Sequence, residues 1–286
     1  MRTNRIIFVL ITFCFLNTLI FADAASTSIN WTNVEGPYRF DGYCSPRKGV
    51  HWGVGGLGTV YVSTLEENRD YKILGLDAME SFYGVWFNAS GSGWVVGEDG
   101  LIFHSTDNGY SWVQQQSGTE DTLKAITCLD SKNCWILGDN VFLRTRDAGE
   151  KWSELEEVNA DQLDFVNLND GWASDYHHLY RTRDSGTTWT KLNEEEKANN
   201  DAADLFQSIE FINKKIGWAA GEGKVGYTSD GGKSWKITKI EDSNFVGIAS
   251  ADKKKATAVN RGRYNYCTSD MGKTWDQCGI AEWAKD

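Results

Sequence analysis

An eight-residue phrase recurs five times along the chain and constrains the fold more than any other feature. Its pattern is [Ser/Thr]-x-Asp-x-Gly-x-x-Trp, and its first copy occupies residues 105–112. The aspartate can accept hydrogen bonds from backbone N–H groups just ahead of it, the glycine can adopt a positive φ, and the tryptophan adds a large apolar ring. We therefore expect a structural turn at each copy. The aspartates are Asp107, Asp147, Asp184, Asp230 and Asp270.

The spacing of this phrase predicts a repeat fold. Successive copies begin roughly 40 residues apart, a period typical of propellers and solenoids. A second phrase, Gly-Trp-x-x-Gly, lies upstream of several copies, as at residues 93–97 and 217–221. Short β-like segments surround both phrases. Each repeat therefore predicts four short antiparallel strands, lettered A to D from the propeller axis outward, with the Gly-Trp phrase in strand B.

We expect an all-β fold made of a single β-propeller. The patterns for strands A to C occur in six sets, which predicts six four-stranded blades, with seven blades as the alternative. Residues 31–34 resemble one further strand D, and we expect that strand to close the ring where the two chain ends meet. The propeller domain is assigned to residues 25–286.

The first 24 residues have the features of a secretory signal peptide. Arg2 and Arg5 precede an apolar run that ends near Phe21 in small residues. A signal anchor is the alternative, because the run approaches the length of a membrane span. No later stretch is apolar enough to cross a bilayer, so we expect a secreted protein without a membrane span after signal removal.

The net charge of −11 disfavours nucleic acid and anionic lipid as partners, because both require clustered Lys and Arg. The chain shows no Cys/His zinc pattern, and neighbouring histidines on a strand face opposite ways, so we expect neither a metal nor another cofactor. The sequons at Asn30 and Asn88 are candidate N-glycosylation sites.

The cysteines suggest two disulfides in an oxidising compartment. Cys128 and Cys134 lie in one repeat across a short expected turn, and Cys267 and Cys278 flank the last eight-residue phrase. Cys14 is removed with the signal peptide. Cys44 is then left unpaired.

The repeated phrase resembles the Asp-box, or bacterial neuraminidase repeat, of sialidases, sortilin-type receptors and xyloglucanase-type glycoside hydrolases. Together with the Gly-Trp phrase, it is more similar to the propellers of the photosystem II assembly and stability factor family. The likeness covers about residues 40–280. It implies a propeller fold, and the boxes are structural wherever they occur. Function does not follow from this fold, because propellers host unrelated activities.

The candidate binding site is the rim where the strand B–C turns converge, because these turns differ from one repeat to the next. We expect one side of this rim to be acidic and the other basic. A merely solvated rim is the alternative. The candidate residues are Glu98, Asp99, Asp139, Asp175, His177, Glu222, Arg261 and Arg263.

A catalytic role is not expected. A sialidase needs an arginine cluster, a Tyr/Glu nucleophile pair and an Arg-Ile-Pro motif, and Pro37 and Pro46 occur in other contexts. Arg146 and Arg183 lie beside the boxes, at the wrong end of the blade. We therefore predict a secreted, non-catalytic protein-binding or scaffold module. The alternatives are a glycan-binding lectin, a photosystem-assembly-like factor and a sialidase-like glycoside hydrolase.

Overall fold

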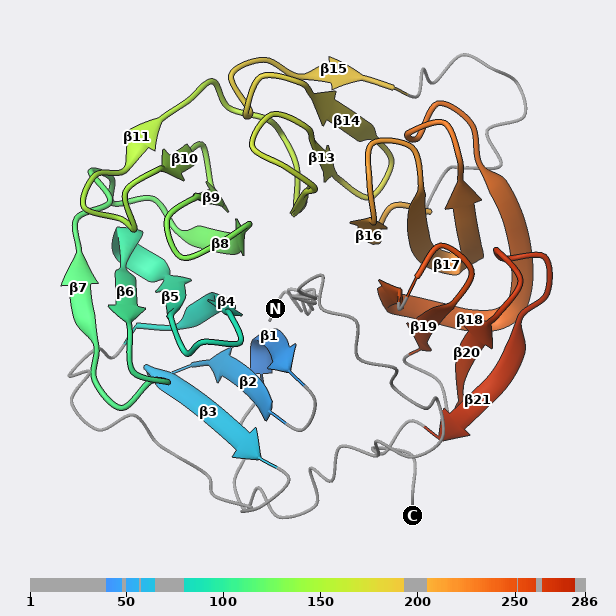
Figure 1. The fold of residues 1–286 in the computed structure, drawn as a ribbon, viewed down its shortest axis with the longest axis horizontal. Coiled ribbons are helices and arrows are strands. Elements are labelled where there is room, and N and C mark those ends of the chain that lie inside the picture. Colours follow the sequence, from blue (N-terminus) through green and yellow to red (C-terminus); the bar gives the residue numbers. More distant parts are fainter. Residues whose placement is uncertain are drawn as a thin grey trace, which may run out of the picture.

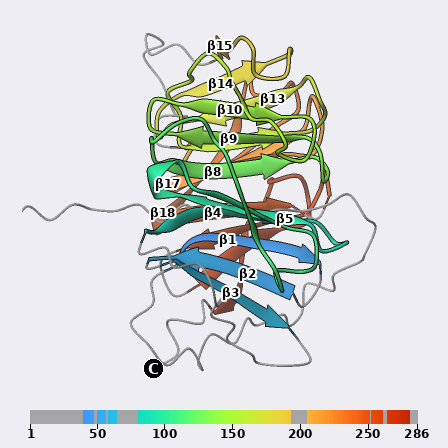
Figure 2. The same ribbon diagram turned by 90° about the vertical axis from the view of Figure 1, so that its left-hand side faces the viewer.

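The computed structural model describes residues 40–47, 50–56, 58–64, 80–192, 205–250, 252–260 and 264–280. Its sheets stand side by side around a common axis as a β-propeller, confirming the predicted fold class (Figure 1). Seen edge-on, the strands run across the ring and their connecting turns gather at its two faces (Figure 2). The signal peptide and the strand expected at residues 31–34 lie outside the described residues.

The first sheet has three strands and the next three sheets have four each. The three-stranded sheet contains β1 (Phe40–Arg47), β2 (Val50–Gly55) and β3 (Thr59–Thr64). The four-stranded sheets contain β4 (Phe82–Phe87), β5 (Gly93–Gly97), β6 (Ile102–Ser105), β7 (Val113–Gln115); β8 (Leu123–Cys128), β9 (Cys134–Gly138), β10 (Phe142–Thr145), β11 (Ser153–Glu154); and β12 (Gln162–Phe165), β13 (Gly171–Ser174), β14 (Leu179–Thr182), β15 (Thr190–Lys191). A single 3₁₀ turn, η1 (Glu98–Gly100), joins β5 to β6.

The last sheet has six strands because two repeats are hydrogen-bonded into one sheet. Backbone pairing continues through two connections where the sequence predicts separate strands, so β17 spans strands B and C of one repeat and β18 spans its strand D and the next strand A. Gly223 and Asp242, with φ values of 65° and 56°, turn the chain in these connections. Glu222 and Asn244 pair at this junction. Six A-to-C sets are therefore described, and the number of blades in the whole chain stays a prediction. The strands are β16 (Ser208–Phe211), β17 (Gly217–Thr228), β18 (Lys236–Ser250), β19 (Ala256–Asn260), β20 (Tyr264–Thr268) and β21 (Asp276–Ile280).

A repeated aromatic stack fastens successive repeats to one another. The strand B tryptophan of one repeat stacks on the phenylalanine that ends strand A of the next. The ring centroids of Trp135 and Phe165 lie 3.9 Å apart, and those of Trp172 and Phe211 lie 3.8 Å apart. These rings are buried, so the Gly-Trp tryptophans pack between successive repeats.

The glycine of the Gly-Trp phrase makes room for this stack. A Cβ atom at Gly171 would lie 2.6 Å from the Phe165 ring, and one at Gly217 would lie 2.4 Å from the Phe211 ring. Such approaches are shorter than van der Waals contact. Any other residue at these positions would therefore displace the ring on which the preceding repeat packs.

Candidate binding surfaces

The two faces of the ring are built from different turns. One face, called the box face below, carries the strand A–B turns and the Asp-box turns between strands C and D. The opposite face, called the rim face, carries the B–C turns and the D–A connections. All candidate binding residues were predicted on the rim face, so the important difference is which polar side chains on each face are bonded within their own turns.

The Asp-box turn is closed by its own side chains, as its first copy shows. The Asp107 carboxylate accepts hydrogen bonds from the backbone N–H of Ser111 at 2.9 Å, from the Ser111 hydroxyl at 2.6 Å and from the Ser105 hydroxyl at 2.8 Å. Ser105 Oγ in turn accepts the N–H of Gly109 at 2.8 Å. The aspartate side chain is therefore committed to holding the turn.

These bonds change the ionisation of the box aspartates. The Ser111 hydroxyl and N–H, followed by the Ser105 hydroxyl, hold the pKa of Asp107 below its ordinary value, because they stabilise the carboxylate. At Asp184 and Asp230 desolvation is the largest single effect and raises the pKa, but the equivalent bonds together lower the pKa of these two aspartates and of Asp147 and Asp270. A carboxyl with a depressed pKa is a poor general acid, which fits the structural interpretation of the boxes.

The residue after each box aspartate also has a positive φ, a feature that the sequence analysis missed. Its φ lies between 60° and 79° in the five copies. In this conformation its N–H donates to a carbonyl of the A–B turn in the same repeat, over 2.8–3.2 Å. The two kinds of turn on the box face are thus joined in every copy. These residues are Asn108, Ala148, Ser185, Gly231 and Met271.

Each A–B turn that receives this bond is closed by an Asn or Asp side chain. Asn213 Oδ1, for example, accepts the N–H groups of Lys215 at 2.9 Å and Ile216 at 3.0 Å. In four of the five turns, the sequence signal is an Asn or Asp five or six residues before the strand B tryptophan; the strand B that follows Asp252 has no tryptophan. The five closing residues are Asn88, Asp130, Asn167, Asn213 and Asp252.

Strand B tryptophans also hydrogen-bond to the box turn of the next repeat. Trp135 Nε1 donates to the Ser185 carbonyl at 2.9 Å, and Trp172 Nε1 donates to the Gly231 carbonyl at 3.0 Å. The Trp218 indole N–H, although buried, has no partner among the described residues. The box turns are therefore part of the contact between repeats.

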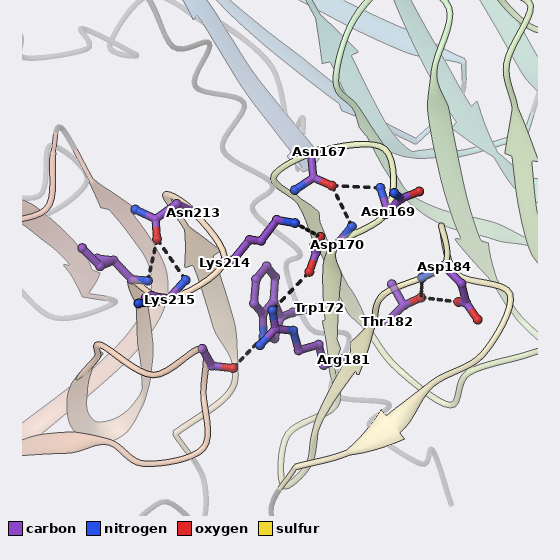
Figure 3. Close-up of polar contacts among 12 residues, drawn as sticks. Asn167, Asn169, Asp170, Trp172, Arg181, Thr182, Asp184, Asn213, Lys214 and Lys215 are labelled. Atoms are coloured by element: carbon purple, nitrogen blue, oxygen red, sulfur yellow. Dashed lines mark hydrogen bonds and ion pairs between the residues drawn. The ribbon is translucent and has the colours of Figure 1, made fainter.

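An ion-pair cluster in which Asp170 and Arg181 are buried and Lys214 is exposed reinforces one such contact (Figure 3). The Arg181 guanidinium lies 4.7 Å from the centroid of the Trp172 ring and bonds to Asp170 at 3.1 Å. Lys214, from the next repeat, reaches the other oxygen of Asp170 at 2.9 Å. Although burial raises it, the bonds from Lys214 and Arg181 hold the pKa of Asp170 below its ordinary value. Arg181 is thus placed to support packing between repeats.

On the rim face, the candidate acids are bonded to neighbouring elements. Glu98, in η1, accepts the Ser81 N–H at 2.7 Å and the Tyr83 hydroxyl at 2.8 Å. Asp139 forms an ion pair with Lys124 of strand β8. Asp99 is exposed beside Glu98. Glu98 and Asp99 therefore lie on one turn, where the Glu98 carboxylate is hydrogen-bonded and Asp99 is exposed.

A second group of rim residues connects two repeats. Asp175 closes its turn by accepting the N–H groups of His177 at 2.7 Å and His178 at 2.6 Å, and its other oxygen lies 2.7 Å from His178 Nδ1. The Tyr176 hydroxyl donates to Glu222 of the next repeat at 2.7 Å. His177 is exposed and His178 is half-buried, so the two rings have different surroundings.

The basic half of the predicted rim lies outside the described residues, because Arg261 and Arg263 fall in the gap at 261–263. A polar recess of about 330 Å³ lies at the outer part of the rim face, lined by Asp99, Gly100 and residues 114–120. Its lining contains no aromatic side chain on which a sugar ring would stack.

Two carboxyls on the innermost strands link three successive repeats. Asp164 of β12 accepts the Phe211 N–H of β16, and Glu210 of β16 accepts the Ser250 N–H of β18. Burial raises the pKa of Asp164 to about 6. Burial, together with the nearby charge of Asp164, raises the pKa of Glu210 to about 8. Sequence analysis missed both residues, because neither belongs to a repeated phrase.

The remaining sequence predictions concern covalent features and metals. Cys128 is joined to Cys134 and Cys267 to Cys278, as their spacing predicted. Cys44 lies in β1 and its redox state stays a prediction. Asn88 closes an A–B turn through Oδ1, and its glycosylation is untested; Asn30 lies outside the described residues.

Over the described ranges, no cluster of three or more His, Cys, Asp or Glu side chains is placed to hold a metal ion. No helix there has the length and apolar character needed to cross a membrane.

Comparison with known families explains the repeated geometry. The profile of the photosynthesis system II assembly factor YCF48 matches residues 63–160 and 155–282. The chain belongs to the YCF48 family. The resemblance predicted from the Asp-box and Gly-Trp phrases is therefore confirmed. A sequence comparison with curated proteins finds no match.

Solved structures show the same fold at low sequence identity. A structure of YCF48 bound to D1 peptide has 20% identity and a TM-score of 0.65, covering 82% of this chain and 80% of that one. The WD40 propeller domain of Doa1 has 10% identity and a TM-score of 0.65, covering 84% and 82%. The GH74 enzyme of Niastella koreensis has 17% identity and a TM-score of 0.60, covering 84% of this chain and only 38% of the enzyme. These likenesses concern the fold.

Proposed function

We propose that this YCF48-family chain is a secreted, non-catalytic propeller that binds a peptide or protein segment on its rim face. The observation that carries the proposal is the family match, which spans both halves of the repeat array. A YCF48 structure of the same fold holds D1 peptide. A peptide is therefore the first candidate ligand for this chain. Such binding would act in the assembly of a photosystem-like complex.

The disposition of the carboxylates supports a non-catalytic role. The box aspartates are bonded by their own turns, and Glu98 and Asp175 are bonded by backbone N–H groups of the rim. Asp164 and Glu210, whose pKa values are raised, lie on the inner strands and accept N–H groups from the neighbouring repeat. Burial also raises the pKa of Asp161, which lies just before β12. In the GH74 enzyme, a region of this fold makes up about two fifths of the chain, so the likeness does not transfer its activity.

The rim face is the proposed binding surface because its turns differ in sequence while the box turns repeat. Asp99 and His177 are exposed there, and Glu222 and Tyr176 tie two neighbouring turns together. A peptide segment with basic side chains would form ion pairs with these acids on a surface that is already ordered. The proposed contribution of Arg261 and Arg263 is to bind acidic groups at the other side of the rim.

The D1 peptide serves as the first probe. Fluorescence anisotropy of the labelled peptide should show saturable binding that weakens as salt rises, because exposed charge pairs are screened over about 10 Å at 0.1 M. A peptide of the same composition in scrambled order is the control. Absence of binding to D1 peptide, together with failure of affinity capture from the native source to yield any protein, would exclude the proposed function.

Secretion is tested separately. If residues 1–24 form a signal peptide, the protein recovered from a secreting host should begin near residue 25 by N-terminal sequencing. A mature protein that retains Met1 and stays attached to the membrane would instead support the signal-anchor alternative. Peptide mass mapping of the same sample would show whether Asn30 and Asn88 carry glycans.

A further inference from the structure

The lysines of the last two described repeats gather on the box face. They belong to the A–B turns 213–216 and 252–255 and to the box turns 230–234 and 270–274, and all are exposed. We call these residues the lysine surface. They are Lys214, Lys215, Lys233, Lys253, Lys254, Lys255 and Lys273.

Hydrogen bonds between these turns make the lysine surface one structural unit. The Gly231 N–H donates to the Lys215 carbonyl at 2.8 Å, and the Met271 N–H donates to the Lys254 carbonyl at 3.0 Å. The two repeats are in turn connected by Trp218, whose ring meets Trp275 edge-on with centroids 5.9 Å apart. The charges are thus presented by turns of fixed relative position.

The acidic residues of the same turns are fewer, and their carboxylates are bonded locally. Asp230 accepts the Ser234 N–H at 3.0 Å and its hydroxyl at 2.6 Å. Asp252 accepts the N–H groups of Lys254 at 2.6 Å and Lys255 at 2.9 Å. These turns carry seven lysines against three aspartates, so their net charge is positive even though Lys214 is paired with Asp170.

Large exposed hydrophobic side chains lie on turns of the same face. Leu168 is 49% exposed on the A–B turn of the preceding repeat, close to the Asp170–Lys214 ion pair. Tyr110 is 80% exposed at the box turn between β6 and β7. A face that combines lysines with projecting apolar side chains fits the boundary between charged lipid headgroups and acyl chains.

We propose that the lysine surface, together with Leu168, docks the propeller on an anionic membrane surface. The whole-chain charge of −11 does not prevent this, because the seven lysines outnumber the three acids of their own turns and the rim acids lie on the opposite face. Strands of four or five residues separate the two faces by about 15 Å. Charges at that separation are largely screened at 0.1 M salt, where the Debye length is about 10 Å. This docking is independent of peptide binding on the rim face and leaves that face directed away from the membrane.

Vesicle flotation at 0.1 M salt tests the proposal with the mature protein. The vesicles contain either phosphatidylcholine alone or phosphatidylcholine with about one third phosphatidylserine. The test variant is K253Q/K254Q/K255Q. The control is K191Q/K224Q/K239Q, which makes the same change in net charge at strand positions near the rim face. Unchanged thermal unfolding of both variants shows that they are folded.

The wild type and the control should float with the anionic vesicles, remain unbound with phosphatidylcholine alone, and dissociate at 0.5 M salt. The test variant should bind at least tenfold more weakly, and Leu168→Ser should weaken binding by a smaller factor. Equal binding of the two triple variants, or no binding of the wild type, would overturn the proposal. Binding to soluble polyglutamate without binding to the vesicles would also overturn it and indicate an acidic protein partner instead.

Discussion

The box face and the rim face of this propeller both carry hydrogen-bonded polar side chains but use them differently. On the box face, the same bonds recur from one repeat to the next, from Ser111 to Asp107 and from Ser234 to Asp230. On the rim face, the hydrogen bonds differ from turn to turn: Glu98 accepts one from Tyr83, and Glu222 accepts one from Tyr176. Repetition indicates residues that hold the ring together, and variation indicates residues available for recognition.

The contrast is strongest where the box face meets the next repeat. The Trp172 ring packs on Phe211, carries the Arg181 cation on its face and bonds to the Gly231 carbonyl. No rim contact combines so many interactions in the described structure. Substitutions on the two faces should therefore differ most in their effect on stability.

The largest expected effect is that of Trp172→Ala. It removes a fully buried ring, the stack on Phe211 and the bond to Gly231, so the free energy of unfolding should fall by about 3–5 kcal/mol. Denaturant unfolding followed by circular dichroism measures the change. A loss below about 1 kcal/mol would mean that the contact between these repeats does not support the ring.

Protonation of the inner carboxyls should give the next largest effect. The folded state raises the pKa of Glu210 to about 8 and of Asp164 to about 6, so between about pH 4 and 8 it binds more protons than the unfolded state. Their contribution to the free energy of unfolding therefore falls as pH rises through this window.

Glu210→Gln isolates this contribution, because the amide oxygen can still accept the Ser250 N–H. At pH 9 the variant should be more stable than the wild type by about 1 kcal/mol or more, since one pKa unit corresponds to about 1.4 kcal/mol. At pH 4 the two proteins should differ little. Thermal unfolding across the pH range measures the difference, and the same offset at both pH values would contradict the explanation.

A box substitution should have a comparable or smaller effect. Asp230→Ala leaves the Ser234 N–H and the Thr228 hydroxyl without their acceptor, so we expect a loss of about 1–3 kcal/mol. Glu241→Ala, at an exposed position near the rim face, is the control and should change stability by less than about 0.5 kcal/mol. Equal losses in the two variants would remove the distinction between the faces.

The smallest expected effect is on the rim. Tyr176→Phe removes only the hydroxyl that bonds Glu222 at an exposed site, so the loss of stability should stay below about 1 kcal/mol. Urea unfolding of this variant and of Trp172→Ala measures the smallest and the largest expected loss in the free energy of unfolding. A loss above about 2 kcal/mol would show that the rim, too, holds the ring together.

Sequence patterns predicted much of this fold because the stabilising residues repeat. The box aspartates, the strand B tryptophans and both disulfides were predicted at the positions where the structure has them. Asp164 and Glu210 were missed, because their environment is made by strands that come together only in the ring. The pairing of β17 with β18 along residues 224–227 follows the predicted C–D pairing, but the pairing of Glu222 with Asn244 was missed, because it depends on how the next repeat lies beside this connection.

The charge distribution shows a second limit of sequence analysis. A net charge of −11 predicts that the chain avoids anionic partners, but it does not reveal that the lysines after Asn213 and Asp252 share one face. That arrangement depends on the docking of each box turn onto its A–B turn. A whole-chain charge therefore describes solubility better than it describes an individual surface.

We propose that the rim face recognises the partner and that the box turns support the ring. The most direct test measures affinity for the D1 peptide, or for the partner obtained by affinity capture, in two double variants of equal charge. R261A/R263A changes the predicted rim, and R146A/R183A changes the box turns. We expect at least a tenfold loss of affinity in the first variant and a change below twofold in the second. Loss of binding in R146A/R183A with full affinity in R261A/R263A would contradict it.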